Sequence, residues 1–154
     1  MSLSLPTGIT KALSLKQPYA WLIANGYLLV DDRTWGTHYR GPILIHASKG
    51  IYQEYYDYIE SNTDVPIPAI EELGFGGIVG IAKLLLCCRP AELPARLSYQ
   101  QRVHFGGVHQ DCFGFLFEQA TPLRLIPCAG KLGIFEVDLD ALLAAPPHLQ
   151  TELF

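Results

Sequence analysis

Side chains that can recognise an anionic or aromatic ligand are concentrated between residues 13 and 49 of the sequence. Arginine presents a planar fork of N–H donors that matches a phosphate group, and lysine supplies a positive point charge. Tryptophan can stack on a nucleic-acid base. These side chains are predicted at the ends of short elements, where they can converge on one ligand. The candidate binding residues are Ser14, Lys16, Gln17, Pro18, Asp31, Arg33, Trp35, Arg40, His46 and Lys49.

Several of these residues also have a purely structural interpretation. Arg33 can clamp Asp31 or Asp32 within the scaffold instead of holding a phosphate. Trp35 at a strand end and His46 in an apolar strand are typical of packing residues as well as of ligand contacts. The sequence therefore leaves ligand contact and scaffold support open for each of them.

Two pairs of residues indicate more specific chemistry. Lys16 and Gln17 follow a predicted strand and precede a helix N-terminus, where backbone N–H groups favour an anion. Ser14 and His46 form a conceivable nucleophile pair, although the sequence shows no third group to orient the histidine. Arg40 can contact a phosphate or remain a solvated surface residue.

The elements predicted to position these residues are short strands around a few short helices. Pro18 is typical of a helix start, and Gly26 accepts the left-handed conformation that often ends a helix. Alternating or continuous runs of apolar residues favour strands. Strands are expected at 10–15, 28–30, 42–46, 76–87, 112–119, 121–126 and 132–137, helices at 18–25, 50–60 and 138–144, and a short helical piece at 69–73.

Length and composition indicate one ordered domain over residues 1–154. Hydrophobic residues make up 49% of the chain and charged residues 17%, a composition typical of an ordered globular protein. No segment shows the polar composition of a disordered tail. The longest apolar run, 78–88, is interrupted by Lys83 and is shorter than the roughly 20 residues that cross a bilayer. The start of the chain does not resemble a signal peptide. We therefore expect a cytoplasmic protein without a membrane partner.

Charge is distributed unevenly along the chain. The net charge is -4, which disfavours a long nucleic-acid duplex as a partner. Residues 1–50, however, contain five Lys and Arg residues against two acidic residues, whereas residues 51–154 contain six against thirteen. A local basic site on an acidic body suits a small anion or a few nucleotides.

Blocks of sequence over residues 11–138 resemble the ASCH domain, a member of the PUA-like superfamily. The blocks are Ser-Leu-Lys-Gln-Pro-Tyr-Ala-Trp-Leu-Ile at 14–23, Arg-Thr-Trp at 33–35, Arg-Gly-Pro-Ile-Leu-Ile-His-Ala-Ser-Lys at 40–49, Gly-Ile-Val-Gly at 77–80, Phe-Gly-Phe-Leu-Phe at 113–117 and Gly-Lys-Leu-Gly-Ile-Phe-Glu-Val at 130–137. The resemblance implies an α+β fold: a small PUA-like β-barrel flanked by short helices, with a cleft lined by the Gln-Pro segment and the segment from Gly26 to Arg33. It also implies RNA or nucleotide binding, and some small members that it resembles hydrolyse the acetyl amide of N4-acetylcytidine.

The chain departs from the family at the signature Gly-x-Lys-x-x-Glu-x-Arg. Gly26 and Arg33 match it, Asp31 shortens the glutamate, and Leu28 replaces the lysine. The resemblance implies that this lysine is catalytic in the amidohydrolase members. There it acts together with a threonine at the position of Asp31 and a more distant glutamate. Leucine cannot act as nucleophile, base or oxyanion clamp.

The sequence therefore favours a binding module whose cleft holds RNA, a nucleotide or a modified nucleoside. An enzyme remains the alternative, either an N4-acetylcytidine amidohydrolase or a ribonuclease, with Lys16 or Lys49 as weak catalytic candidates. A third possibility is a protein-interaction domain with a vestigial cleft. Lys131 is expected to support the end of the barrel.

Neither a cofactor nor a metal ion is predicted from the sequence. The four cysteines form no Cys-x-x-Cys pair, so buried free thiols are expected. His104, His109 and Cys112 form one metal-like cluster, but no fourth ligand is evident and the spacing matches no strong zinc pattern.

Overall fold

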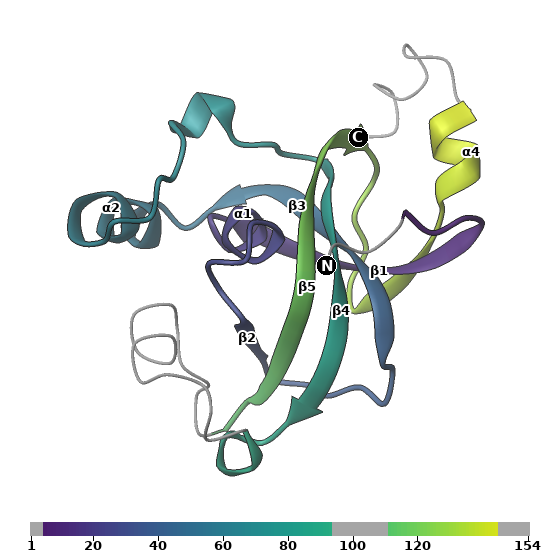
Figure 1. The fold of residues 1–154 in the computed structure, drawn as a ribbon, viewed down its shortest axis with the longest axis horizontal. Coiled ribbons are helices and arrows are strands. Elements are labelled where there is room, and N and C mark those ends of the chain that lie inside the picture. Colours follow the sequence, from purple (N-terminus) through teal and green to yellow (C-terminus); the bar gives the residue numbers. More distant parts are fainter. Residues whose placement is uncertain (1–4, 94–110, 145–154) are drawn as a thin grey trace.

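The computed structural model describes residues 5–93 and 111–144, which form a six-stranded sheet curled into a half-barrel with short helices around it (Figure 1). The α+β class expected from the sequence is confirmed. The strands are β1 (Ile9–Gln17), β2 (Val30–Arg33), β3 (Gly41–Ile51), β4 (Gly77–Cys88), β5 (Phe113–Pro127) and β6 (Ile134–Asp138). The helices are α1 (Tyr19–Ala24), α2 (Gln53–Asn62) and α4 (Leu139–Ala144), and the 3₁₀ turns are η1 (Ile70–Glu72) and η2 (Pro90–Glu92).

The order of the strands places β1 and β3, which both carry candidate binding residues, side by side. The sheet runs β2-β5-β4-β3-β1-β6, and β1 and β3 pair in parallel while the other neighbours pair antiparallel. In the parallel register Ser14 of β1 lies opposite His46 of β3. Two residues separated by 32 positions in the chain thus become neighbours across one pair of strands.

Strand β3 lies at the centre of the fold and is covered on both faces. Ile43 and Ile45 pack in a core that also contains Leu22 and Ile23 of α1, whereas Leu44 packs with Phe135 of β6 in a second core. All three β3 residues are fully buried. A strand that is buried on both sides reads as a continuous apolar run, which explains the uninterrupted Ile-Leu-Ile sequence.

Helix α1 packs closely against the sheet because a glycine lies beneath it. A Cβ atom at Gly80 of β4 would come within 2.6 Å of the Ala24 Cβ atom, so a larger residue there would push the helix away. Gly26 then has a φ angle of +78°, the left-handed conformation that ends the helix. The predicted end of this helix is confirmed.

Two predicted strands differ from the observed strands by more than two residues at one end. The strand expected at 28–30 starts only at Val30, because the N–H groups of Tyr27 and Leu28 bond back to the Leu22 carbonyl. Strand β3 continues past residue 46 to Ile51, and α2 therefore starts later than predicted.

The two strands predicted at 112–119 and 121–126 are one long strand, β5. Gln119, with a φ angle of 54°, marks a bend between them, and the pairing of β5 with β4 shifts register around this point. The predicted break is therefore a change of direction within the strand.

Helices long and apolar enough to span a membrane are absent from the described ranges 5–93 and 111–144.

Candidate ligand-binding cleft

A cleft of about 1220 Å³ lies where β1 and β3 meet β2 and the connection between β5 and β6. Residues of β1, α1, β2 and β3 line it together with the connection between β5 and β6. Its volume exceeds the range of about 300–1,000 Å³ that is common for small-molecule pockets. The lining residues are Ser14, Leu15, Lys16, Tyr19, Asp31, Asp32, Arg33, Trp35, His46, Ser48, Lys49, Tyr52, Gly76, Cys128, Ala129, Gly130, Lys131, Leu132 and Gly133.

Most of the candidate residues predicted from the sequence meet in this cleft. Those that line it are Ser14, Lys16, Asp31, Arg33, Trp35, His46 and Lys49. Residues of β1 and β3 meet there because the two strands run side by side in parallel, and the bond from Arg33 to the Ser14 carbonyl holds the end of β2 against them. Positive charge dominates the lining in the described part of the chain, with Lys16, Arg33, Lys49 and Lys131 against Asp31 and Asp32.

Gln17, Pro18 and Arg40 do not line the cleft, in contrast to the prediction. Gln17 is 1% exposed, and its amide donates to the Gly74 carbonyl and accepts from the Trp21 N–H. Gln17 of β1 is therefore hydrogen-bonded to α1 and to the segment before β4. Pro18 is buried at the start of α1.

Arg40 is directed toward backbone carbonyls outside the cleft. Its guanidinium donates to the carbonyls of Thr37 and Tyr39 at 2.9 and 2.8 Å, and to the Cys87 carbonyl at 3.2 Å. These bonds hold the connection between β2 and β3 against the end of β4.

Arg33 makes the scaffold bonds that the sequence suggested and also lines the cleft. Its Nε atom donates to Asp31 Oδ2 at 2.9 Å, and its Nη2 atom donates to the Ser14 carbonyl at 2.7 Å. The guanidinium carbon lies 5.7 Å from the centre of the Trp35 ring. Arg33 is thus clamped to the scaffold and still borders the cleft, which gives the site a fixed positive charge.

Asp31 is a buried carboxyl group in the wall of the cleft. Burial raises the pKa of Asp31 to about 6, although the Arg33 guanidinium lowers it and Asp32 adds to the rise. The charge of this wall therefore changes within the range from pH 5 to pH 7.

Ser14 and His46 form a hydrogen-bonded pair inside the cleft. Ser14 Oγ lies 2.9 Å from His46 Nδ1, and His46 Nε2 lies 2.7 Å from the Cys128 carbonyl oxygen. A carbonyl can only accept, so Nε2 carries a proton. Burial lowers the pKa of His46, opposed by the bond to Cys128, and the neutral ring therefore presents an unprotonated Nδ1 to the serine hydroxyl. The sequence showed no group that could orient the histidine, and in the structure the Cys128 carbonyl has this position.

Aromatic rings border the cleft on the side of α1 and α2. Tyr19 and Tyr52 meet edge to face with centroids 5.5 Å apart, and Tyr19 stacks on Tyr55 at 4.7 Å. The Lys16 ammonium lies 4.8 Å from the Tyr52 ring centre. Trp35 packs edge to face on Phe115 at 5.2 Å, so this ring both supports the core and faces the cleft.

Some lining residues were missed by the sequence reasoning. Tyr19 directly follows Pro18, yet its position in the first helical turn gave no sign of the cleft. Lys131 lies in the Gly130–Gly133 loop and lines the cleft as an exposed residue, whereas the sequence suggested a support for the barrel. The glycines on both sides of Lys131 were the available signal for a loop that approaches other groups closely.

The part of the chain that the structure describes contains no group of three His, Cys, Asp or Glu side chains able to hold a metal ion. His104 and His109 lie outside the described residues. The described cysteines are free thiols, as expected, but only Cys128 is buried, and Cys87, Cys88 and Cys112 are partly exposed.

The curled sheet and its strand order define a small α+β half-barrel. The solved structure of ASCH from Zymomonas mobilis shares this fold, with 18% identity, a TM-score of 0.51 and coverage of 87% of this chain and 92% of that chain. A serine-to-alanine variant of the same protein matches with 18% identity, a TM-score of 0.51 and coverage of 91% and 98%. The chain therefore has the ASCH domain fold. No protein-family model and no curated protein matches the sequence.

Leu28, which stands where the signature of the resembling proteins has a lysine, does not line the cleft. Leu28 is 1% exposed and packs in the core with Leu22 and Ile23 of α1. A leucine there contributes to packing, and no charged group from this position reaches the cleft.

Proposed function

We propose that the cleft binds a nucleotide or a short single-stranded RNA. The observation that carries this proposal is the combination of four cationic side chains with exposed ring surface in one cleft. Single-stranded nucleic acids are recognised by such combinations, because cations contact the phosphates while rings stack on the bases. The volume of about 1220 Å³ leaves room for more than one nucleotide.

The placement of Leu28 favours binding over the amidohydrolase chemistry of the proteins that the sequence resembles. Lys16 and Lys49 are both exposed at the cleft, where they suit phosphate contacts.

Binding of a short fluorescent single-stranded RNA, followed by fluorescence anisotropy, tests the proposal. We expect Lys16→Gln and Lys49→Gln each to weaken binding several-fold and to reduce the salt slope by about 0.7. Lys83→Gln is the matched control, because Lys83 lies on β4 outside the cleft and pairs with Glu118 at 3.7 Å.

Equal affinity of the two cleft variants and the wild type would contradict the proposal. So would an equal loss of affinity in Lys83→Gln, since a general charge effect would then explain the binding. Analysis of the same samples for shortened RNA and for deacetylation of N4-acetylcytidine separates binding from turnover.

A further inference from the structure

The Ser14–His46 pair has the arrangement of a nucleophile and its general base. The tautomer fixed by the Cys128 carbonyl leaves Nδ1 as an acceptor, and Nδ1 faces the only hydroxyl hydrogen that Ser14 carries. A serine is activated as a nucleophile when a positioned base accepts its proton. The base is in turn oriented by a third group, here a main-chain carbonyl.

The pair is held by rigid elements. Ser14 and His46 lie opposite each other in the parallel pairing of β1 and β3, near the middle of both strands. His46 is 2% exposed, and its ring packs edge to face on Phe135 with centroids 5.8 Å apart. Groups on packed strands keep their geometry better than groups on loops.

The Gly130 backbone lies directly against the pair. A Cβ atom at this position would come within 2.8 Å of His46 Cε1 and 3.3 Å of Ser14 Oγ. Glycine therefore leaves open the space beside the serine hydroxyl, and Ser14 is only partly buried and lines the cleft. A ligand in the cleft can reach the hydroxyl.

Arg33 supplies positive charge next to the serine. Its Nη2 atom binds the carbonyl of Ser14 itself at 2.7 Å, which fixes the guanidinium beside the nucleophile. Among the described residues, two of its five N–H groups have acceptors. Fixed positive charge near a reacting carbonyl stabilises the oxyanion that forms on it.

We propose that Ser14 and His46 hydrolyse a carboxylic ester bound in the cleft. Ser14 Oγ attacks the carbonyl carbon while His46 Nδ1 takes its proton, and the alcohol leaves with that proton, which forms an acyl ester on Ser14. Water then attacks this ester, His46 accepts the proton of the water and returns it to Ser14, and a carboxylic acid is released. The ester substrate carries a phosphate on its alcohol part, a feature that rests on the proposed function.

An alkyl fluorophosphonate tests the nucleophile in the wild-type protein without any variant. The reaction forms a bond from Ser14 Oγ to phosphorus and releases fluoride together with the serine proton. We expect peptide mass spectrometry to place the phosphonyl group on Ser14. An unmodified Ser14 after prolonged exposure would overturn the proposal.

Variants then test the base and the specificity of labelling. We expect His46→Gln and Ser14→Ala to reduce both labelling and hydrolysis of p-nitrophenyl acetate at least 100-fold. Ser61→Ala, which removes an exposed serine of α2, should leave both unchanged. Labelling of Ser14 that persists in a folded His46→Gln protein would refute the role of the histidine, with circular dichroism as the check of folding.

The two proposals fail separately. Because p-nitrophenyl acetate and the fluorophosphonate carry no phosphate, an adduct on Ser14 without RNA binding supports the ester hydrolase and contradicts the proposed function. RNA binding without an adduct leaves the proposed function intact and overturns the ester hydrolase.

Discussion

Asp31 is the residue through which pH acts on the cleft. Its carboxyl group has a pKa of about 6 because burial outweighs the favourable charge of Arg33. The charged groups that face it are Arg33, which binds it, and Asp32, while Tyr19 has a pKa raised to about 12 and stays neutral. Below pH 6 the cleft therefore loses one negative charge, and the charge of Arg33 becomes available to an anion.

We expect wild-type affinity for a short single-stranded RNA to rise as the pH falls from 7.5 to 5.5. One unit charge at a distance of about 4 Å in water corresponds to about 1 kcal/mol, or roughly fivefold in affinity. Asp31→Asn should bind more tightly than the wild type at pH 7.5 and should show a smaller pH dependence. A pH profile that is the same in Asp31→Asn and in the wild type would assign the effect to another group.

At the scale of elements, Gln17 links β1 to α1 and to the segment before β4. Its Nε2 atom donates to the Gly74 carbonyl at 2.8 Å, and its Oε1 atom accepts from the Trp21 N–H at 2.9 Å. Gln17→Leu keeps a similar volume but leaves both backbone groups without these partners. A buried backbone group without a partner costs about 1–3 kcal/mol.

We expect Gln17→Leu to lower the free energy of unfolding by about 2–4 kcal/mol in urea denaturation. Gln53→Leu is the matched control, because Gln53 is exposed on α2 and bonds only the side chain of Asp57 in the described residues. The control should change stability by less than about 0.5 kcal/mol. Similar losses in both variants would show that glutamine removal itself, and not the tie between elements, is responsible.

Elements with a strong local signal were predictable from the sequence, and contacts between distant residues were not. The apolar run of β3 and the residues that bound α1, Pro18 and Gly26, are recognisable from the local sequence alone. The partner of Gln17, by contrast, lies 57 residues away at Gly74. Side chains that bond distant backbone groups give no periodic pattern, so Gln17 was indistinguishable from a ligand-binding residue.

The Ser14–His46 pair shows the same limit within the site. Both residues were recognisable as candidates, but their contact depends on the parallel register of β1 and β3, which the sequence does not encode locally. The orienting carbonyl of Cys128 comes from the connection after β5, 82 residues beyond His46. Every residue has a backbone carbonyl, so the sequence cannot indicate which one binds the histidine.

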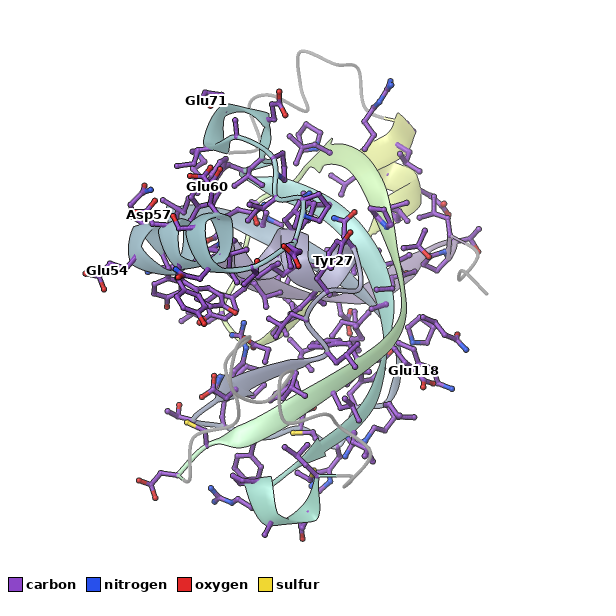
Figure 2. All side chains as sticks on the ribbon, turned by 60° about the vertical axis from the view of Figure 1, so that its left-hand side comes forward. Tyr27, Glu54, Asp57, Glu60, Glu71 and Glu118 are labelled. Atoms are coloured by element: carbon purple, nitrogen blue, oxygen red, sulfur yellow. The ribbon has the colours of Figure 1, made fainter. Side chains whose placement is uncertain are left out.

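At the scale of the whole molecule, the basic cleft and the acidic surface occupy different places. Glu54, Asp57 and Glu60 of α2 and Glu71 of η1 gather on one side, as Figure 2 shows. These four acidic side chains lie outside the cleft and contribute to the net charge of -4. A short ligand in the cleft meets local positive charge, whereas a longer polyanion also approaches the acidic side.

The length of a bound RNA should therefore decide how affinity responds to charge on α2. We expect the triple variant Glu54→Gln, Asp57→Asn, Glu60→Gln to bind a 20-nucleotide single strand several-fold more tightly than the wild type. Its affinity for a trinucleotide should be nearly unchanged, because repulsion between exposed charges is screened beyond about 10 Å at 0.1 M salt. For the trinucleotide, the slope of log affinity against log salt should be about -2, because single strands lose about 0.7 per phosphate contact. Anisotropy titrations between 50 and 300 mM salt measure both quantities. A steep slope with the trinucleotide, or equal gains for both lengths, would mean that the ligand lies along the acidic side of α2 and not within the cleft.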